Sequence, residues 1–130
     1  MEAPERVLID TSVLIAHLRG QIRLHEMIAD YEQLFISAIT VYELEYGARR
    51  AGRASDLDAL RGWFTILPFD EVAARKAAEI QAMLVRKNKR IGDRDVLIAA
   101  TALVHDLALM TRNVREYRRV PGLRVVEGIF

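Results

Sequence analysis

Three short segments of the chain each place an acidic side chain where it could bind a divalent cation. Asp10 follows the apolar run VLI, Glu43 lies within TVYELEYG, and Asp95 precedes the apolar run VLIAATALV. Each acid stands at the expected start of a helix beside strongly apolar sequence, where an unpaired charge is costly. A fourth segment, LMTRNVREY, adds oxygen-bearing side chains at Thr111, Asn113 and Glu116.

This set of oxygen ligands suits the hydrolysis of a phosphoester. A divalent cation removes the repulsion between clustered carboxylates, and oxygen ligands favour Mg²⁺, or Mn²⁺, over zinc. Such an ion can activate a water molecule and stabilise charge on the scissile phosphate and the leaving oxygen. The chain has no cysteine, and its histidines, His17, His25 and His105, are scattered along the sequence.

Each acid can also be explained as part of a helix start. Asp is a preferred N-cap residue, so Asp10 could simply cap the helix that follows it. Thr40 and Glu43 fit the S/T-x-x-E pattern of a capping box. Asp93 and Asp95 both precede the most apolar helix, although one acid would suffice to interact with its dipole. Capping explains each acid alone better than it explains all of them together.

The elements that must position these acids alternate between short apolar strands and longer amphipathic helices. We predict strands at 6–10, 33–37, 65–69, 107–111 and 123–127, and helices at 12–19, 21–31, 41–51, 54–64, 70–90 and 95–106. This order indicates an α/β three-layer sandwich, in which a mainly parallel sheet of about five strands lies between helices. Ligands bind at the carboxyl ends of parallel strands, so Asp10 and Thr111 are expected at the same edge.

The composition fits one globular domain over residues 1–130. Of these residues, 52% are hydrophobic, which is enough for one core. The longest apolar run is about half as long as a membrane span, and we expect a cytoplasmic protein. Residues 86–130 carry ten basic and five acidic side chains. This basic third could contact nucleic acid, although a general preference for arginine explains it equally well.

Five segments, taken in order, resemble the motifs of PIN-domain ribonucleases, and specifically of the VapC-type toxins of prokaryotic toxin–antitoxin pairs. They are LIDTSVLI, ISAITVYELEYGARR, LPFDEVAARKAAEI, IGDRDVLIAATAL and LMTRNVREYRRVPGLRVVE. The resemblance covers nearly the whole chain and implies a PIN-like fold and a Mg²⁺-dependent endoribonuclease acting on RNA phosphodiester bonds. It also implies a small antitoxin partner that blocks the site, and a homodimer.

The resemblance also implies roles for the matching residues. Asp10, Glu43 and Asp95 would bind the metal ion, and Glu116 would be a further catalytic acid. Asp93 would be an additional helix cap at a variable position. Many PIN domains have an Asp where this chain has Asn113, and this departure leaves the number of bound metal ions open. Supporting hydroxyl groups would come from Thr11 and Thr111.

Basic side chains near these segments are candidates for contacts with the RNA backbone. The candidates are Arg86, Lys87, Lys89, Arg90 and Arg112. A solvated helix end, where positive charge also interacts favourably with the dipole, explains the same residues equally well. The aromatic residues Tyr42, Tyr46 and Trp63 are expected to pack in the core or at an interface, and stacking on an RNA base is conceivable for them.

Other functions are open on the sequence alone. A PIN-fold module that binds RNA or protein without cleavage would have no need of clustered carboxylates. A housekeeping RNA-processing nuclease would use the same chemistry as a toxin. A phosphatase of the haloacid-dehalogenase type would have a second Asp two residues after Asp10, where this chain has Ser12. A receiver domain would need a lysine near the last strands, but the lysines are at 76, 87 and 89.

Overall fold

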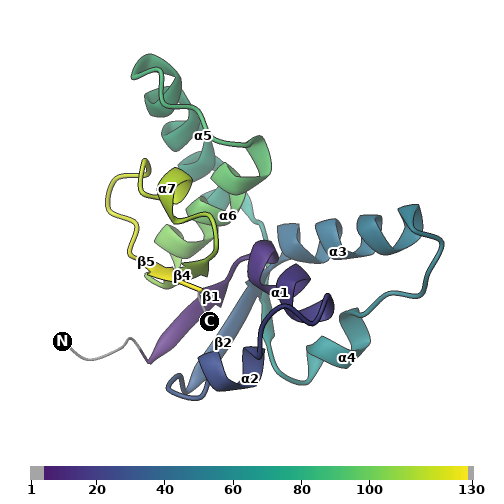
Figure 1. Ribbon diagram of the computed structural model, residues 1–130. Helices are drawn as coiled ribbons and strands as arrows, with labels where there is room; N and C mark the ends of the chain where they lie inside the picture. Colours follow the sequence, from purple (N-terminus) through teal and green to yellow (C-terminus); the bar gives the residue numbers. More distant parts are fainter. Residues whose placement is uncertain (1–4, 129–130) are drawn as a thin grey trace.

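The computed structural model describes residues 5–128, and residues 1–4 and 129–130 lie outside the described part. Its strands form one sheet in the order β3-β2-β1-β4-β5, with every neighbouring pair parallel (Figure 1). They are β1 (Arg6–Ile9), β2 (Gln33–Ser37), β3 (Thr65–Leu67), β4 (Ala108–Thr111) and β5 (Val125–Glu127). The predicted parallel sheet is confirmed, and each strand lies where the sequence predicted it.

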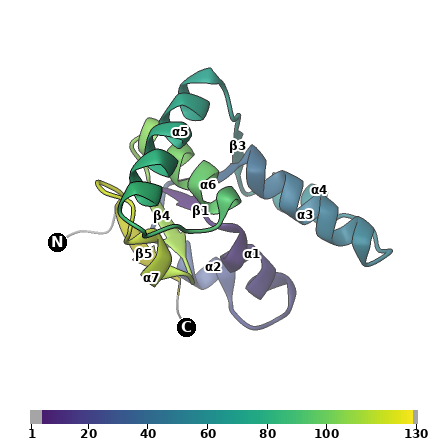
Figure 2. The same cartoon turned by 90° about the horizontal axis from the view of Figure 1, so that it is seen from above.

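Helices cover both faces of the sheet and make the molecule a three-layer sandwich (Figure 2). They are α1 (Thr11–Leu18), α2 (Leu24–Met27), α3 (Ala38–Arg50), α4 (Leu57–Arg61), α5 (Glu71–Arg86), α6 (Asp93–Val104) and α7 (Val114–Tyr117). One apolar cluster joins the sheet to α1–α4 and a second joins it to α5–α7. Within β1, Val7 and Ile9 belong to the first cluster and Leu8 to the second, because successive side chains of a strand point to opposite faces.

Three predicted helices are shorter in the structure, and one of them, predicted over 54–64, is reduced to α4. The helix predicted over 21–31 is reduced to the single turn α2, and its flanking apolar residues Ile22 and Ile28 are buried outside that turn. The helix predicted over 70–90 ends at Arg86, because Asn88 adopts a left-handed conformation with φ of 54°. Asparagine tolerates this conformation better than most residues and commonly follows a helix end. None of the helices within residues 5–128 is long and apolar enough to cross a membrane.

Helix α3 begins three residues before its predicted start. Ser37, the last residue of β2, is its N-cap, and the Ser37 side chain accepts a hydrogen bond from the Ile39 backbone N–H at 3.0 Å. Thr40 is therefore buried inside the helix, and the capping box predicted for Thr40 and Glu43 is wrong. The direct passage from β2 into α3 turns Glu43 toward the carboxyl end of the sheet.

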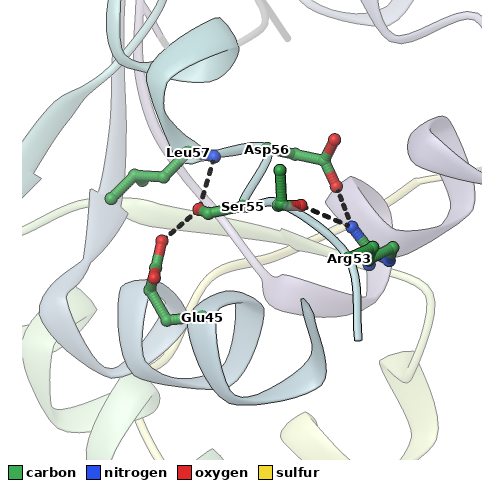
Figure 3. A network of polar contacts seen from close by, with 6 residues as sticks. Glu45, Arg53, Ser55, Asp56 and Leu57 are labelled. Atoms are coloured by element: carbon green, nitrogen blue, oxygen red, sulfur yellow. Dashed lines mark hydrogen bonds and ion pairs between the residues drawn. The ribbon is translucent and has the colours of Figure 1, made fainter. Parts of the chain in front are cut away.

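Helices α3 and α4 extend away from the part of the molecule formed by α5–α7 (Figures 1 and 2). Polar contacts hold the turn between them (Figure 3). The Ser55 hydroxyl contacts the Glu45 carboxylate and accepts a hydrogen bond from the Leu57 backbone N–H at 3.1 Å, while Arg53 pairs with Asp56. A groove runs between α1 and α3 from Glu43 toward this turn.

Candidate active site at the carboxyl ends of the strands

Asp10 lies immediately after β1 and is almost fully buried, with 2% of its surface exposed. It occupies the N-cap position of α1, but its carboxylate turns to three hydroxyl groups rather than to the helix start. The hydroxyls of Ser12 and Thr111 donate to Oδ2 at 2.7 and 2.8 Å, and the Tyr117 hydroxyl donates to Oδ1 at 3.0 Å. The explanation of Asp10 as a simple helix cap is therefore wrong.

The hydroxyl groups around Asp10 are themselves held by the chain that follows β4. The Ser12 hydroxyl accepts a hydrogen bond from the Arg112 backbone N–H at 3.1 Å, and the Thr111 hydroxyl accepts one from the Asn113 backbone N–H at 2.9 Å. Because each hydroxyl accepts from a backbone N–H, its own proton is directed to the carboxylate. Thr111 was predicted as a supporting group, whereas Ser12 was not.

Asp95 reaches the same place from the first turn of α6. Its Oδ1 atom lies 3.1 Å from the hydroxyl of Tyr117, which also contacts Asp10. Tyr117 comes from α7, a single turn that the sequence did not predict, and its side chain is fully buried. Burial raises the pKa of Tyr117 far above its usual range, and the charges of Asp10 and Asp95 raise it further. The phenol therefore stays protonated and remains a hydrogen-bond donor.

Glu43 approaches from α3 on the other side of the site. Its Oε1 atom accepts a hydrogen bond from the Thr11 hydroxyl at 2.8 Å, and that hydroxyl lies 2.9 Å from the hydroxyl of Thr40. Its Oε2 atom lies 3.7 Å from the Arg94 guanidinium. Thr11 thus supports Glu43, while Thr111 supports Asp10.

Arg94 contacts an exposed pair of aromatic rings as well as Glu43. Its guanidinium lies 5.5 Å from the centre of the Tyr42 ring, and the Tyr42 ring is parallel to that of Tyr46. Residues Tyr42, Tyr46 and Trp63 are 54%, 48% and 45% exposed. The prediction that these aromatic residues pack in the core is wrong, and their place in an interface stays a prediction.

The acids from the four predicted segments interact through their charges. Burial, followed by the charge of Asp10, raises the pKa of Asp95 to about 6. The charges of Glu43 and Glu116 also raise it. Burial raises the pKa of Glu43, and the charge of Asp10 adds to this while Thr11 and Arg94 lower it. Four segments distant in sequence therefore build one strongly negative site at one end of the sheet.

Comparison with known proteins identifies the family to which this arrangement belongs. The PIN domain family profile matches residues 7–123. The chain belongs to the PIN-domain family. A relative named ribonuclease VapC1, from Rickettsia felis, is 35% identical over 127 residues, which cover 92% of this chain and 94% of that protein.

Two solved structures each contain a chain with a similar fold. The DNA-bound VapBC structure from Salmonella typhimurium contains a chain that is 28% identical, with a TM-score of 0.83, and the match covers 94% of this chain and 97% of that one. A toxin–antitoxin complex from Klebsiella pneumoniae contains a chain that is 27% identical, with a TM-score of 0.73 and coverages of 92% and 95%. The resemblance to VapC-type PIN domains that the sequence motifs indicated is confirmed.

The donor set of this PIN domain is chemically suited to Mg²⁺. Within residues 5–128, no three His, Cys, Asp or Glu side chains are arranged so that they could hold a metal ion as they stand. Mg²⁺ commonly binds through one or two carboxylates and keeps several of its waters. Asp10 and Asp95, whose Oδ1 atoms share one hydroxyl partner, supply two carboxylates. Metal binding by Asp10, Glu43 and Asp95 stays a prediction.

The remaining predicted site residues lie at the rim. Asn113 and Glu116 are both exposed, at the cap and in the turn of α7. Asp93 is the first residue of α6 and its carboxylate lies 3.5 Å from Arg90, whereas Gly92 is the N-cap. The prediction that Asp93 caps this helix is therefore wrong.

The basic candidates form two groups on the surface. Arg86, Lys87, Lys89 and Arg90 are exposed at the end of α5 and in the loop that follows it. Arg112 lies beside the acid site, where its backbone N–H contacts Ser12 and its guanidinium contacts the Gln21 side chain at 3.1 Å. Their role in RNA binding stays a prediction.

Three further residues contact the acids but were not predicted from the sequence: Ser12, Arg94 and Tyr117. Ser12 stands two residues after Asp10, and Arg94 directly precedes Asp95, so both lie inside motifs that were already identified. Tyr117 follows Glu116 in a segment rich in oxygen ligands. The available signal was their position within these motifs. Their side-chain types alone do not distinguish them from ordinary surface or core residues.

Proposed function

We propose that this chain is a Mg²⁺-dependent endoribonuclease, with Mn²⁺ as an alternative metal, and that it is the toxin of a toxin–antitoxin pair. The observation that carries this proposal is that Asp10, Asp95 and Glu43 come together at the carboxyl end of the sheet, where Tyr117 contacts the first two and the charge of Asp10 raises the pKa of the other two. Repulsion between these carboxylates is unfavourable unless a cation offsets it. The ribonuclease name of the Rickettsia felis relative supports RNA as the substrate.

In this proposal Asp10 and Asp95 bind the metal ion, and Glu43 binds it when its carboxylate turns from Arg94. The bound ion would supply activation of a water molecule and stabilisation of charge on the scissile phosphate. The hydroxyls of Ser12 and Thr111 keep the Asp10 carboxylate in one orientation before the ion arrives.

The exposed rim would handle the RNA. Glu116 contributes negative charge from the rim without being buried, so we propose that it acts through water rather than as a direct ligand. Arg94 is half exposed and would be attracted to a phosphate group that approaches Glu43. The basic groups at 86–90 and at Arg112 would attract the RNA backbone and release its counterions.

We also propose that the chain binds a small antitoxin protein, as a toxin of this kind requires. The groove between α1 and α3 combines apolar residues such as Ile15 and Leu44 with Arg19 and Arg53, and Glu43 lies at its edge. A small antitoxin that occupied this groove would block access to the acids. The toxin–antitoxin complex from Klebsiella pneumoniae supports a partner of this kind. A homodimer and a cytoplasmic location are part of the same proposal.

The first test is thermal unfolding with and without millimolar Mg²⁺ or Mn²⁺. A ligand that binds the native state raises its stability by about 2.7 kcal/mol at a concentration one hundred times its Kd. We expect this gain for the unmodified chain and for Asp58→Asn, a control that neutralises an exposed acid on α4. We expect no gain for Asp10→Asn.

The second test is cleavage of single-stranded RNA, with EDTA as the metal-free condition. Metal-stimulated cleavage that disappears in Asp10→Asn is the expected result. RNA binding without cleavage, together with no stabilisation by either metal, would contradict the proposal and favour a binding module. Cleavage that persists in EDTA would contradict the metal-dependent mechanism alone.

A further inference from the structure

Tyr117 is a fully buried aromatic residue whose hydroxyl group ends in the acid site. It belongs to α7, which follows β4 directly, and its ring lies in the apolar cluster beneath α5 and α6. Other members of that cluster include Leu109 of β4 and Val96 of α6. A phenylalanine would fill the same apolar space, so ring packing alone does not account for the hydroxyl.

The hydroxyl connects two acids that the chain brings from distant elements. It lies 3.0 Å from Oδ1 of Asp10 and 3.1 Å from Oδ1 of Asp95. Asp10 follows β1, whereas Asp95 lies in the first turn of α6. One hydroxyl proton is therefore shared between two carboxylates that would otherwise face each other. Hydrogen bonds to an ionised acceptor are roughly twice as strong as those between neutral groups.

We propose that Tyr117 is a positioning residue, whose buried hydroxyl group holds the Asp10 and Asp95 carboxylates at the spacing that a divalent cation requires. This inference rests on the proposed metal-dependent nuclease function. It adds a residue that touches the carboxylates rather than the RNA. In the metal-free chain the hydroxyl sets the separation of the two acids, and in the loaded chain it fixes their orientation.

The rest of the site explains why this hydroxyl is needed at Asp95. Ser12 and Thr111 already orient Asp10 through its Oδ2 atom. Tyr117 is the hydrogen-bond donor that the described residues provide to the Asp95 carboxylate. Gly92 lies against the other oxygen of Asp95, because a Cβ atom at Gly92 would stand 3.3 Å from Oδ2. The missing side chain of Gly92 therefore leaves room for Oδ2 of Asp95, while the Tyr117 hydroxyl contacts Oδ1.

The decisive variant is Tyr117→Phe, which removes the hydroxyl and keeps the ring. Partners that orient metal ligands typically contribute 10–100-fold to metal affinity or activity. We expect the Kd for Mn²⁺, measured by calorimetry on the full chain, to increase about tenfold. We expect kcat for RNA cleavage to fall by a similar factor at saturating Mn²⁺, with KM unchanged. Tyr31→Phe, which alters a half-buried tyrosine of the other cluster, should leave all these values unchanged.

A second measurement follows Tyr117 in the unmodified chain, so it does not depend on the folding of Tyr117→Phe. The chain has four tyrosines, so tyrosine labelled with ¹³C at Cζ gives four resonances. Single Phe substitutions of the other tyrosines assign the Tyr117 signal by elimination. Titration with Mg²⁺ should shift this signal more than those of Tyr31 and Tyr46.

The outcomes distinguish this inference from the proposed function. If the unmodified chain binds neither Mn²⁺ nor Mg²⁺, the proposed function fails and this inference fails with it. If the unmodified chain binds Mn²⁺ and Tyr117→Phe binds it within twofold, the metal site stands and the inference is overturned. A Tyr117 resonance that does not move on titration with Mg²⁺ would overturn it as well.

Discussion

The two sides of the acid site are built in different ways. On the buried side, Asp10 is 2% exposed and accepts hydrogen bonds from Ser12, Thr111 and Tyr117 at 2.7 to 3.0 Å. On the open side, Glu43 pairs with Arg94 at 3.7 Å, and the Arg94 side chain is half exposed. The buried carboxylate is held by short contacts with fixed groups, whereas the open one is held partly by a long, solvent-screened ion pair.

This contrast indicates that the Asp10 carboxylate is held rigidly, whereas the Glu43–Arg94 pair can rearrange. Groups fixed by packing and hydrogen bonds lose little freedom when a ligand binds, so they suit a metal ion with a strict geometry. A long exposed ion pair contributes about 1 kcal/mol or less and rearranges easily. We therefore expect changes to the hydroxyls and acids on the buried side to affect metal binding and catalysis, and changes to Arg94 on the open side to affect mainly the interaction with RNA.

Neutralising Asp10 should have the largest effect. In Asp10→Asn the hydroxyl donors face an amide in place of one carboxylate oxygen, and the charge that attracts the metal ion is lost. We expect metal-stimulated cleavage to fall by at least about a hundredfold. Activity assays with and without EDTA measure this effect. Near-normal cleavage would remove Asp10 from the mechanism.

Asp95 should make the metal-free protein less stable as the pH rises. Its pKa is raised from 3.8 to about 6 in the folded chain, so the folded state binds this proton more tightly than the unfolded state. The free energy of unfolding should therefore decrease between these two pH values and stay lower above them. The stabilisation that the protonated Asp95 carboxyl group gives to the folded state is complete below pH 3.8 and is lost above about pH 6.

The variant Asp95→Asn tests this pH dependence directly. In this variant the free energy of unfolding should no longer decrease between pH 3.8 and about pH 6. At pH 8 in EDTA, the variant should be more stable than the unmodified chain. Metal binding requires an ionised carboxylate, so stabilisation of the unmodified chain by Mg²⁺ should weaken below about pH 6. Thermal unfolding across pH, with and without Mg²⁺, measures both effects. Parallel pH profiles for the two chains would contradict the raised pKa of Asp95.

Removing the Thr111 hydroxyl should have an intermediate effect on the buried side. Thr111→Val keeps the volume but removes the donor to Asp10 and the acceptor for the Asn113 backbone N–H. We expect about a tenfold loss of metal affinity. The matched control is Thr101→Val, since Thr101 is equally buried but its hydroxyl donates to the Leu97 carbonyl within α6. Equal losses in both variants would indicate a general packing effect.

Removing the Arg94 side chain should have the smallest effect on activity, and it should change the binding of RNA rather than the rate of cleavage. In Arg94→Ala we expect KM for RNA to increase severalfold, with kcat and Mn²⁺ affinity nearly unchanged. Stability should change by about 1 kcal/mol or less. Arg75→Ala is the control, because Arg75 forms a more exposed ion pair with Glu71 on α5, away from the acid site. A large loss of kcat at saturating RNA would contradict the division between the two sides.

Much of the fold could be predicted because its signals are local. The strand that precedes Asp10 and the apolar helix that follows Asp95 each have a period and composition that identify them. Helix boundaries were less accurate where one side chain decides them. Ser37 caps α3 and places its start before the predicted one, and the left-handed conformation of Asn88 ends α5 before its predicted end. The one-turn helix α7 is too short for any periodic pattern to predict.

The sequence by itself determined the parallel α/β architecture, the family, and the four segments that carry the acids. Order along the chain and the burial pattern suffice for these features, because the carboxyl ends of parallel strands share one edge. The tertiary structure alone decided which groups orient each acid. Tyr117 and Arg94 reach the acids only because β1 lies beside β4 and α6 packs nearby. These hydrogen bonds require the positions of atoms far apart in sequence to be correct to within a few tenths of an ångström, and no local pattern contains that information.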